Sequence, residues 1–267
     1  MLQKFPQIKG QELLYQYALL IVPESMVDIV AADKQVAYME KPKRLFFAEL
    51  NVFCNLTKDS DQIKNRFVNR VEENMVLSST QFSDDTGKGV IIAIIDSGID
   101  YAHPDFCNSD GSTRILELWD QTQNHIYTSE EINTALESGN RAAARQIVPS
   151  VDVSGHGTAV AGIAAGLDSG YRGIAYESDL LVVKLGTARP CGFPRTTGLM
   201  RAVNYAVSFA ADRFLPLVIN ISFGNTYGSH DGTSLLETFL DDIGNYGRTT
   251  IVVGSGNEGA ASGHTSG

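Results

Sequence analysis

From residue 90 onward, short apolar runs alternate with longer segments whose apolar residues recur at helical spacing. The runs are rich in β-branched residues, as in strands of a parallel sheet that is buried on both faces. This alternation predicts an α/β fold with a doubly wound parallel sheet. The predicted strands are 90–95, 180–185, 217–222 and 250–253, the predicted helices are 154–166, 197–214 and 235–246, and 126–151 is a more polar, partly helical insertion.

The first 80 residues follow a different pattern and predict a separate small α/β module. They carry 10 basic and 10 acidic residues, whereas the remainder carries 11 and 21 and so holds the whole formal charge of -10. This change predicts two domains, 1–80 and 81–267, which meet near the polar loop 83–89. Within the module we expect strands at 13–22, 36–39 and 45–52, a short helix that begins at Pro23, and a longer helix at 60–75.

The composition narrows the range of partners. A net charge of -10 argues against nucleic acid. Cys54, Cys107 and Cys191 are odd in number and far apart, so we expect reduced thiols and no metal site. The apolar segment 17–22 is too short to span a membrane and has no cationic start or cleavage site, so we expect neither a membrane anchor nor a secretory signal.

Asp96 and His156 are the residues with the clearest chemical potential. Asp96 ends the run 90–95, and the carboxyl ends of strands are where open α/β sheets bind ligands. His156 opens a helix of small residues, and Gly155 and Gly157 beside it leave room for a substrate backbone. Each residue also has a purely structural interpretation, as a turn-forming Asp and as a buried His satisfied by a carbonyl. Together, however, an Asp can fix the tautomer of a His and stabilise its imidazolium, so that the His acts as general base.

With these two motifs the sequence resembles a known family. The segments DSGID (96–100) and HGTAVAG (156–162) are similar to signature motifs of the subtilisin family of serine proteases. Ala159 stands where many relatives carry a second His, which leaves the catalytic position unchanged. The run DGSTRILELWDQT (110–122) resembles a clostridial branch that includes the germination proteases of spores. The resemblance implies a serine endopeptidase that needs no cofactor, acts on a peptide or protein substrate, and is cytoplasmic or spore-associated.

The resemblance also implies two binding elements. Ser222, Phe223 and Gly224 match a Ser-Leu-Gly segment on which the substrate pairs as an added strand, with an ordinary strand-to-loop turn as the alternative. Asn257 matches the oxyanion-hole Asn of the family. The segment 254–259 also fits the GxGxxG pattern of dinucleotide sites. That alternative is disfavoured because no stable helix and no ribose-binding acid follow the glycines.

The motifs leave the nucleophile unassigned. In the family, a Gly-Thr-Ser motif follows the Asn by many tens of residues and opens a helix. The segment 232–235 reads Gly-Thr-Ser-Leu but precedes Asn257, and Ser234 with Glu237 has the spacing of a capping box. Ser266 has no helix after it. We therefore expect the N-terminal portion of a protease that lacks the serine and is inactive alone, with a peptide-binding pseudoprotease as the alternative.

The resemblance gives the N-terminal module a role as well. Subtilisin-like proteases commonly begin with a prodomain that assists folding and blocks the cleft. We expect residues 1–80 to act in this way as a partner of the catalytic domain, with cleavage between residues 75 and 85. A simple accessory domain is the alternative.

Overall fold

A six-stranded sheet forms the centre of the structure, a computed structural model that describes residues 4–47, 86–167, 172–186, 194–224 and 230–256. The interior strand β4, Ile91–Asp96, is buried at all six positions. It pairs in parallel with β7, Asp179–Lys184, on one side and with β8, Leu217–Ile221, on the other. The strand order is β10-β8-β4-β7-β5-β6. The remaining strands are β10, Thr249–Val253, β5, Ile115–Asp120, and β6, His125–Thr128. β6 is antiparallel to β5. The predicted α/β fold with a doubly wound parallel sheet is confirmed, and the sheet is parallel except for β6.

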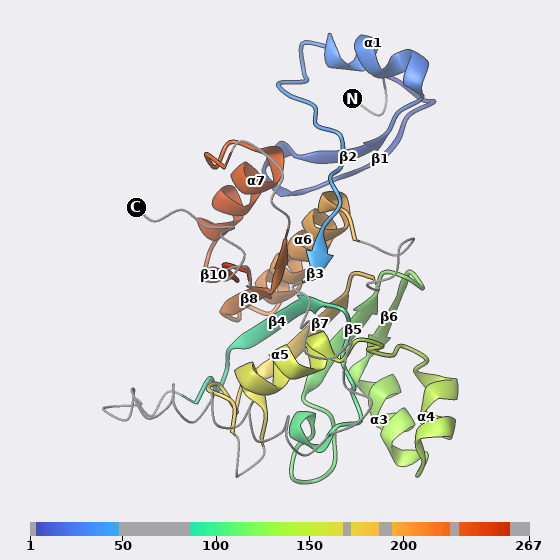
Figure 1. The fold of residues 1–267 in the computed structure, drawn as a ribbon, viewed down its shortest axis with the longest axis vertical. Coiled ribbons are helices and arrows are strands. Elements are labelled where there is room, and N and C mark those ends of the chain that lie inside the picture. Colours follow the sequence, from blue (N-terminus) through green and yellow to red (C-terminus); the bar gives the residue numbers. More distant parts are fainter. Residues whose placement is uncertain (1–3, 48–85, 168–171, 187–193, 225–229, 257–267) are drawn as a thin grey trace.

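Helices cover both faces of this sheet, as Figure 1 shows. Successive residues of β4 point to opposite faces, so Ile91, Ala93 and Ile95 join one apolar cluster while Ile92 and Ile94 join another. This is why the strand reads as a continuous apolar run. The first cluster includes residues of α6, Thr196–Asp212, and α7, Leu235–Gly244, and the second includes residues of α5, His156–Ala165, α3, Ser129–Glu137, and α4, Arg141–Ile147.

The N-terminal residues form a small unit that packs beside α6 and α7 (Figure 1). The Leu14 N–H donates to Asn204 Oδ1 at 2.8 Å, and the Tyr17 hydroxyl donates to Asp242 Oδ2 at 2.8 Å. Further along, Glu40 accepts a hydrogen bond from the N–H of Leu235 at the start of α7. The unit contains the antiparallel strands β1, Lys9–Glu12, and β2, Ala18–Ile21, two 3₁₀ turns, Leu14–Gln16 and Glu24–Met26, and the helix α1, Val27–Ala31.

Several predicted elements of this unit are different in the structure. The strand expected at 13–22 is shortened to Ala18–Ile21, because Tyr15 and Gln16 take positive φ angles of 55° and 67°. The strand expected at 36–39 is absent, and residues 36–40 are irregular. β1 was not predicted, since all four of its residues are exposed and show no apolar alternation. Of the strand expected at 45–52, the structure has β3, Phe46–Phe47; residues 48–52, the predicted helix 60–75, Cys54 and Cys191 lie outside the described residues.

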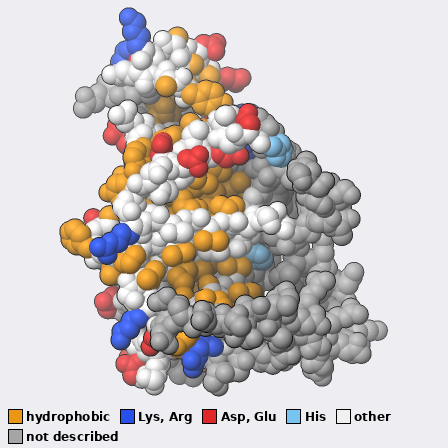
Figure 2. Space-filling view, turned by 90° about the vertical axis from the view of Figure 1, so that its left-hand side faces the viewer, with side chains coloured by type: hydrophobic (Ala, Val, Ile, Leu, Met, Phe, Trp, Pro, Cys, Tyr) orange, Lys and Arg blue, Asp and Glu red, His pale blue; other side chains and the backbone are white. Residues whose placement is uncertain are grey.

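The edge strand β10 carries apolar side chains in contact with solvent. Val252 and Val253 are 49% and 57% exposed. Figure 2 shows hydrophobic side chains spread over the face of the molecule that carries α7 and β10. An edge strand of this kind offers unpaired backbone groups to a further strand. Within the described part of the chain, no helix combines the length and the apolarity that crossing a membrane requires.

The capping box at the start of α7 yields a test of stability. Ser234 Oγ accepts from the N–H of Glu237, and the Ser234 N–H donates to Glu237 Oε2 at 3.0 Å. We expect Ser234→Ala to lower the free energy of unfolding by about 1 kcal/mol in urea denaturation. Thr233→Ala is the matched control, because the Thr233 hydroxyl bonds to Asp231 before the helix begins. Equal effects of the two substitutions would contradict the capping role.

Candidate active site

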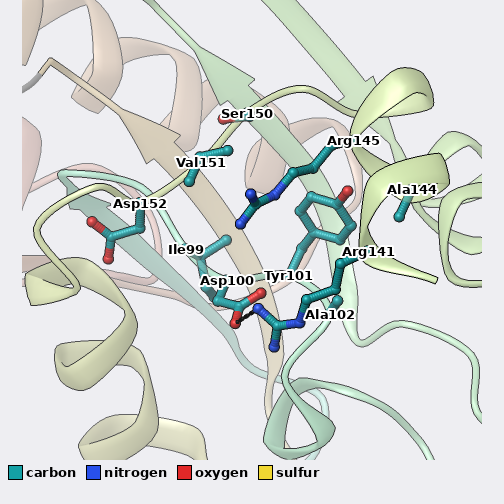
Figure 3. Close-up of a pocket in the computed structure, with 10 residues that line it drawn as sticks. All are labelled: Ile99, Asp100, Tyr101, Ala102, Arg141, Ala144, Arg145, Ser150, Val151 and Asp152. Atoms are coloured by element: carbon teal, nitrogen blue, oxygen red, sulfur yellow. Dashed lines mark ion pairs between the residues drawn. The ribbon is translucent and has the colours of Figure 1, made fainter.

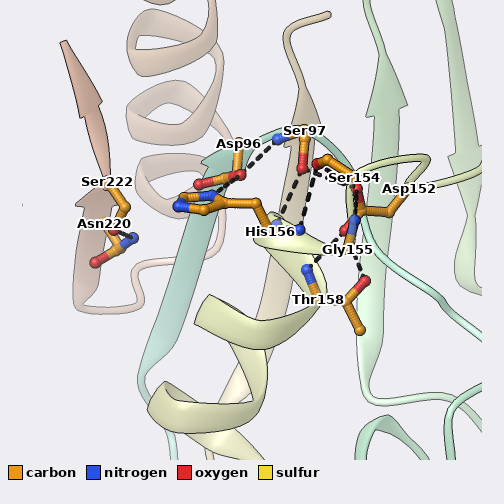
Figure 4. A network of polar contacts seen from close by, with 10 residues as sticks. Asp96, Ser97, Asp152, Ser154, Gly155, His156, Thr158, Asn220 and Ser222 are labelled. Atoms are coloured by element: carbon orange, nitrogen blue, oxygen red, sulfur yellow. Dashed lines mark hydrogen bonds and ion pairs between the residues drawn. The ribbon is translucent and has the colours of Figure 1, made fainter. Parts of the chain in front are cut away.

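Asp96 is the last residue of β4, and its side chain is fully buried. Its Oδ1 accepts a hydrogen bond from the Ser97 N–H at 2.7 Å and lies 2.7 Å from His156 Nδ1 (Figure 4). No donor from the described residues reaches Oδ2. A carboxylate accepts hydrogen bonds only, so His156 donates through Nδ1–H and its ring lone pair lies on Nε2. The sheet and the helix therefore bring together the two residues that the motifs singled out.

His156 is the first residue of α5, and the turn before it depends on glycine. Gly155 precedes the helix with φ of 75°, in the left-handed region. At Gly157, an added Cβ would lie 2.2 Å from the Gly98 carbonyl oxygen and 3.1 Å from Asp96 Cβ. Gly157 thus allows α5 to touch the end of β4, which corrects the expectation that it leaves room for a substrate backbone.

The environment of His156 favours its protonated form. The hydrogen bond to Asp96 raises the pKa of His156, burial opposes this, and the charges of Asp96 and Asp152 add to the increase. The stabilisation from this pair is fully present below the unfolded pKa of about 6.5 and is lost as the pH rises through the higher folded pKa. An imidazole with a raised pKa is a stronger proton acceptor at Nε2.

β9, Phe223–Gly224, follows β8 at the same edge of the sheet as Asp96. It pairs antiparallel with β3, so that Phe46 lies opposite Gly224 and Phe47 opposite Phe223. The Phe223 side chain is buried and Gly224 is exposed. Ser222 Oγ accepts a hydrogen bond from Asn220 Nδ2 at 2.8 Å. β9 belongs to the segment that was predicted to pair with substrate as an added strand. In the structure it pairs with β3 of the same chain.

Asn257, the predicted oxyanion donor, lies outside the described residues. The chain that leads to it is described as far as Gly256, and the Gly254 N–H donates to the Ile221 carbonyl at 2.9 Å. This bond holds the end of β10 against the end of β8. Residues 257–263, on which the dinucleotide alternative depends, also lie outside the described part.

Comparison with known proteins decides the family. The model of the Subtilase family matches residues 87–267, which is well over half of the chain. The chain belongs to the subtilase family. A second family model, that of the Csp protease B prodomain, matches residues 2–43 of this subtilase.

Two named relatives and one solved structure illustrate this membership. The minor extracellular protease Vpr of Bacillus subtilis is 29% identical to this chain, and the match covers 82% of this chain and 25% of Vpr. Subtilisin E of the same species is 31% identical, and the match covers 68% of this chain and 37% of subtilisin E. The structure of the Clostridium perfringens CspB protease is 36% identical, with a TM-score of 0.63, over 69% of this chain and 40% of that one. The chain therefore spans between a quarter and about half the length of the curated relatives it matches. The predicted relation to the clostridial branch is confirmed.

In this subtilase, Asp152 anchors the helix that carries His156. Asp152 Oδ1 accepts from the Ser97 hydroxyl at 2.8 Å and from the Gly155 N–H at 3.0 Å, and Oδ2 accepts from the Thr158 N–H at 2.9 Å and its hydroxyl at 2.8 Å (Figure 4). Ser97 Oγ in turn accepts from the Gly157 N–H. One carboxylate therefore connects the residue after Asp96 with the first turn of α5.

A buried ion pair holds the segment that contains Asp152. Lys184 Nζ lies 3.2 Å from Asp120 Oδ2 and donates to the Val151 carbonyl at 2.9 Å. Ser150 Oγ donates to the same Asp120 oxygen at 2.7 Å. Burial works to raise the pKa of Asp120, but hydrogen bonds from Thr122 and Ser150 and the charge of Lys184 outweigh it and lower that pKa. Removal of one partner from such a pair typically costs about 3–5 kcal/mol.

Asp152, Asp120 and Lys184 were not predicted from the sequence. Asp152 stands two positions before Ser154, and Lys184 is the charged residue within the predicted apolar strand 180–185 and the last residue of β7. A charge at the end of a buried strand was the signal that identified Asp96, and the same signal could have identified Lys184. Among the described residues, no group of three or more His, Cys, Asp or Glu side chains could hold a metal ion.

Asp152 should raise the pKa of His156 through its charge. We expect Asp152→Asn to lower that pKa, because the substitution removes a nearby negative charge. The measurement is an NMR titration of the His156 ring in the full chain. Ser97→Ala breaks one Asp152 hydrogen bond but keeps the charge, so it should shift the pKa less. Asp110→Asn, in an exposed loop, is the control, and an unchanged His156 pKa in Asp152→Asn would contradict the electrostatic role.

Proposed function

We propose that this subtilase contributes to a serine endopeptidase site in which His156 is the general base and Asp96 orients it. The 2.7 Å contact between Asp96 Oδ1 and His156 Nδ1, at the carboxyl edge of a parallel sheet, carries the proposal. The contact leaves Nε2 as the proton acceptor, which is what activation of a serine hydroxyl requires.

In the proposed reaction, His156 Nε2 takes the proton from a serine hydroxyl as its oxygen attacks the scissile carbonyl. The imidazolium that forms is stabilised by the buried Asp96 carboxylate, and it then returns the proton to the leaving amine. The amide of Asn257 would donate to the oxygen that becomes negative, and loss of one such donor typically costs about 3–4 kcal/mol of transition-state stabilisation. Water then attacks the acyl group as His156 takes a proton from it. The serine oxygen leaves and receives that proton, which regenerates the site.

The proposal leaves the nucleophile to a serine outside the described residues. Two described serines lie near the site, but each has another role. Ser97 Oγ donates to Asp152 and accepts from Gly157, and Ser222 Oγ accepts from Asn220. Ser234 belongs to the capping box of α7. By itself, a chain that lacks this serine would bind peptides without acyl transfer.

Substrate would bind as a strand on Ser222, Phe223 and Gly224, and the chain's own N-terminal unit would compete for that place. Residues 43–47 lie between residues 194–196 on one side and β9 on the other. The Lys43 carbonyl accepts from the Thr196 N–H at 3.0 Å, and the Leu45 N–H donates to the Pro194 carbonyl at 2.8 Å, while β3 pairs with β9. Such strand addition uses backbone hydrogen bonds that any extended peptide can make. We propose that residues 1–80 are a prodomain that occupies the cleft of the catalytic domain 81–267.

The role of His156 is tested in a form of the enzyme that includes the serine. We expect His156→Ala to reduce kcat by on the order of 10⁴-fold or more, because the substitution removes the group that accepts the serine proton. Peptide binding, measured by fluorescence anisotropy, should survive. Retained turnover would refute the assignment of the base, whereas binding without any turnover in the parent protein would favour the pseudoprotease.

The competition by residues 43–47 is tested with a labelled peptide of sequence KRLFFA, which corresponds to residues 43–48. Leu45 is 2% exposed, so Leu45→Asp should release the segment and tighten binding of the added peptide by about tenfold or more. Ile21→Asp is the matched control in the same unit, because Ile21 is 73% exposed. Equal affinity of the parent chain and Leu45→Asp would show that the segment does not block β9.

A further inference from the structure

A cavity of about 150 Å³ lies beside Asp152 (Figure 3). In Figure 4, Asp152 and Ser222 lie on opposite sides of His156, so the cavity and β9 flank the base from two directions. One wall of the cavity comes from α4, which belongs to the insertion 126–151. The proposed catalytic roles do not involve the side chains of α4.

The charges around the cavity are unequally compensated. Asp100 Oδ2 is paired with Arg141 at 2.9 Å. Asp152 directs both carboxylate oxygens to donors around the first turn of α5, as described above. Arg145 lies one turn after Arg141 on α4, and its guanidinium points over the cavity in Figure 3. No hydrogen bond or ion pair joins it to another described residue, and its positive charge acts on Tyr101 within the cavity.

The floor of the cavity is apolar, unlike its rim. Ile99, Tyr101 and Ala144 are 1%, 4% and 5% exposed. The Tyr101 hydroxyl donates to the Val148 carbonyl at 3.0 Å, so it is already occupied and the ring presents carbon to the cavity. An apolar floor beside the Arg145 guanidinium suits a side chain with a short aliphatic stem and a terminal carboxylate, and a guanidinium matches that carboxylate geometrically.

We propose that this cavity is a subsite for a glutamate side chain of a bound peptide, with Arg145 as the residue that selects its charge. The assignment to a bound peptide rests on the proposed endopeptidase function, because the cavity borders the same Asp152 that anchors His156. The insertion between the aspartate and histidine motifs thus adds a preference for acidic sequences beside the base.

The first experiment titrates the full ¹⁵N-labelled chain with N-acetylglutamate α-amide and, separately, with N-acetylglutamine α-amide. The two probes have nearly the same shape and differ in charge. We expect saturable NMR shifts at Tyr101, Ala144 and Arg145 with the glutamate probe and weaker binding of the glutamine probe. Equal binding of both, or shifts that do not map to the cavity, would overturn the proposal.

The second experiment repeats the titration with Arg145→Gln, which should weaken glutamate-probe binding by about fivefold, the upper range for a partly exposed ion pair. Arg248→Gln, at an exposed site after α7, is the control and should leave the affinity unchanged. Unchanged affinity in Arg145→Gln, or tighter binding of inorganic phosphate than of the glutamate probe, would refute the subsite. The readout needs neither the serine nor β9, so its failure is distinguishable from failure of the endopeptidase proposal.

Discussion

The close contact between the first turn of α5 and the end of β4 is the constraint on which the site depends. It brings His156 Nδ1 to 2.7 Å from a carboxylate that is completely buried. A buried charge is costly unless polar groups compensate it, and here the Ser97 N–H and the imidazole supply that compensation at Oδ1. The same contact therefore both stabilises Asp96 in the interior and sets the tautomer of the histidine.

Around this contact, charged groups act as structural connectors. Asp152 gathers donors from Ser97 and from the beginning of α5, and the Asp120–Lys184 pair holds the segment that precedes Asp152. Hydrogen bonds to a charged acceptor are shorter and stronger than those between neutral groups. The result is a short path of polar contacts from β5 and β7 to the histidine helix. The base is thus positioned by residues on several separate elements, which a loop alone could not do as rigidly.

The sequence predicted the central sheet well because β4, β7, β8 and β10 each appear as a compact apolar run. Asp96 and His156 could be found because their motifs lie at the ends of such elements. The N-terminal unit was harder to predict, since β1 is exposed throughout and the 3₁₀ turn at Leu14–Gln16 interrupts an apolar stretch with positive φ angles. Asp152, Asp120 and Lys184 were missed because their partners are distant in sequence, and only the folded chain shows that they share one network. The placement of β3 on β9 is likewise a contact between segments more than 170 residues apart along the chain, and no local pattern encodes it.

The fit between Gly98 and Gly157 has a consequence for how the family's motifs should be understood. The glycine of the histidine motif is required because the carbonyl of the aspartate motif occupies the space of its missing side chain. Gly157 is therefore required for packing the helix on the strand, independent of proton transfer. A chain that lost His156 but kept both glycines could still close α5 on β4. In these motifs, Gly157 indicates how α5 packs on β4, whereas the His156 imidazole and the Asp96 carboxylate indicate proton transfer.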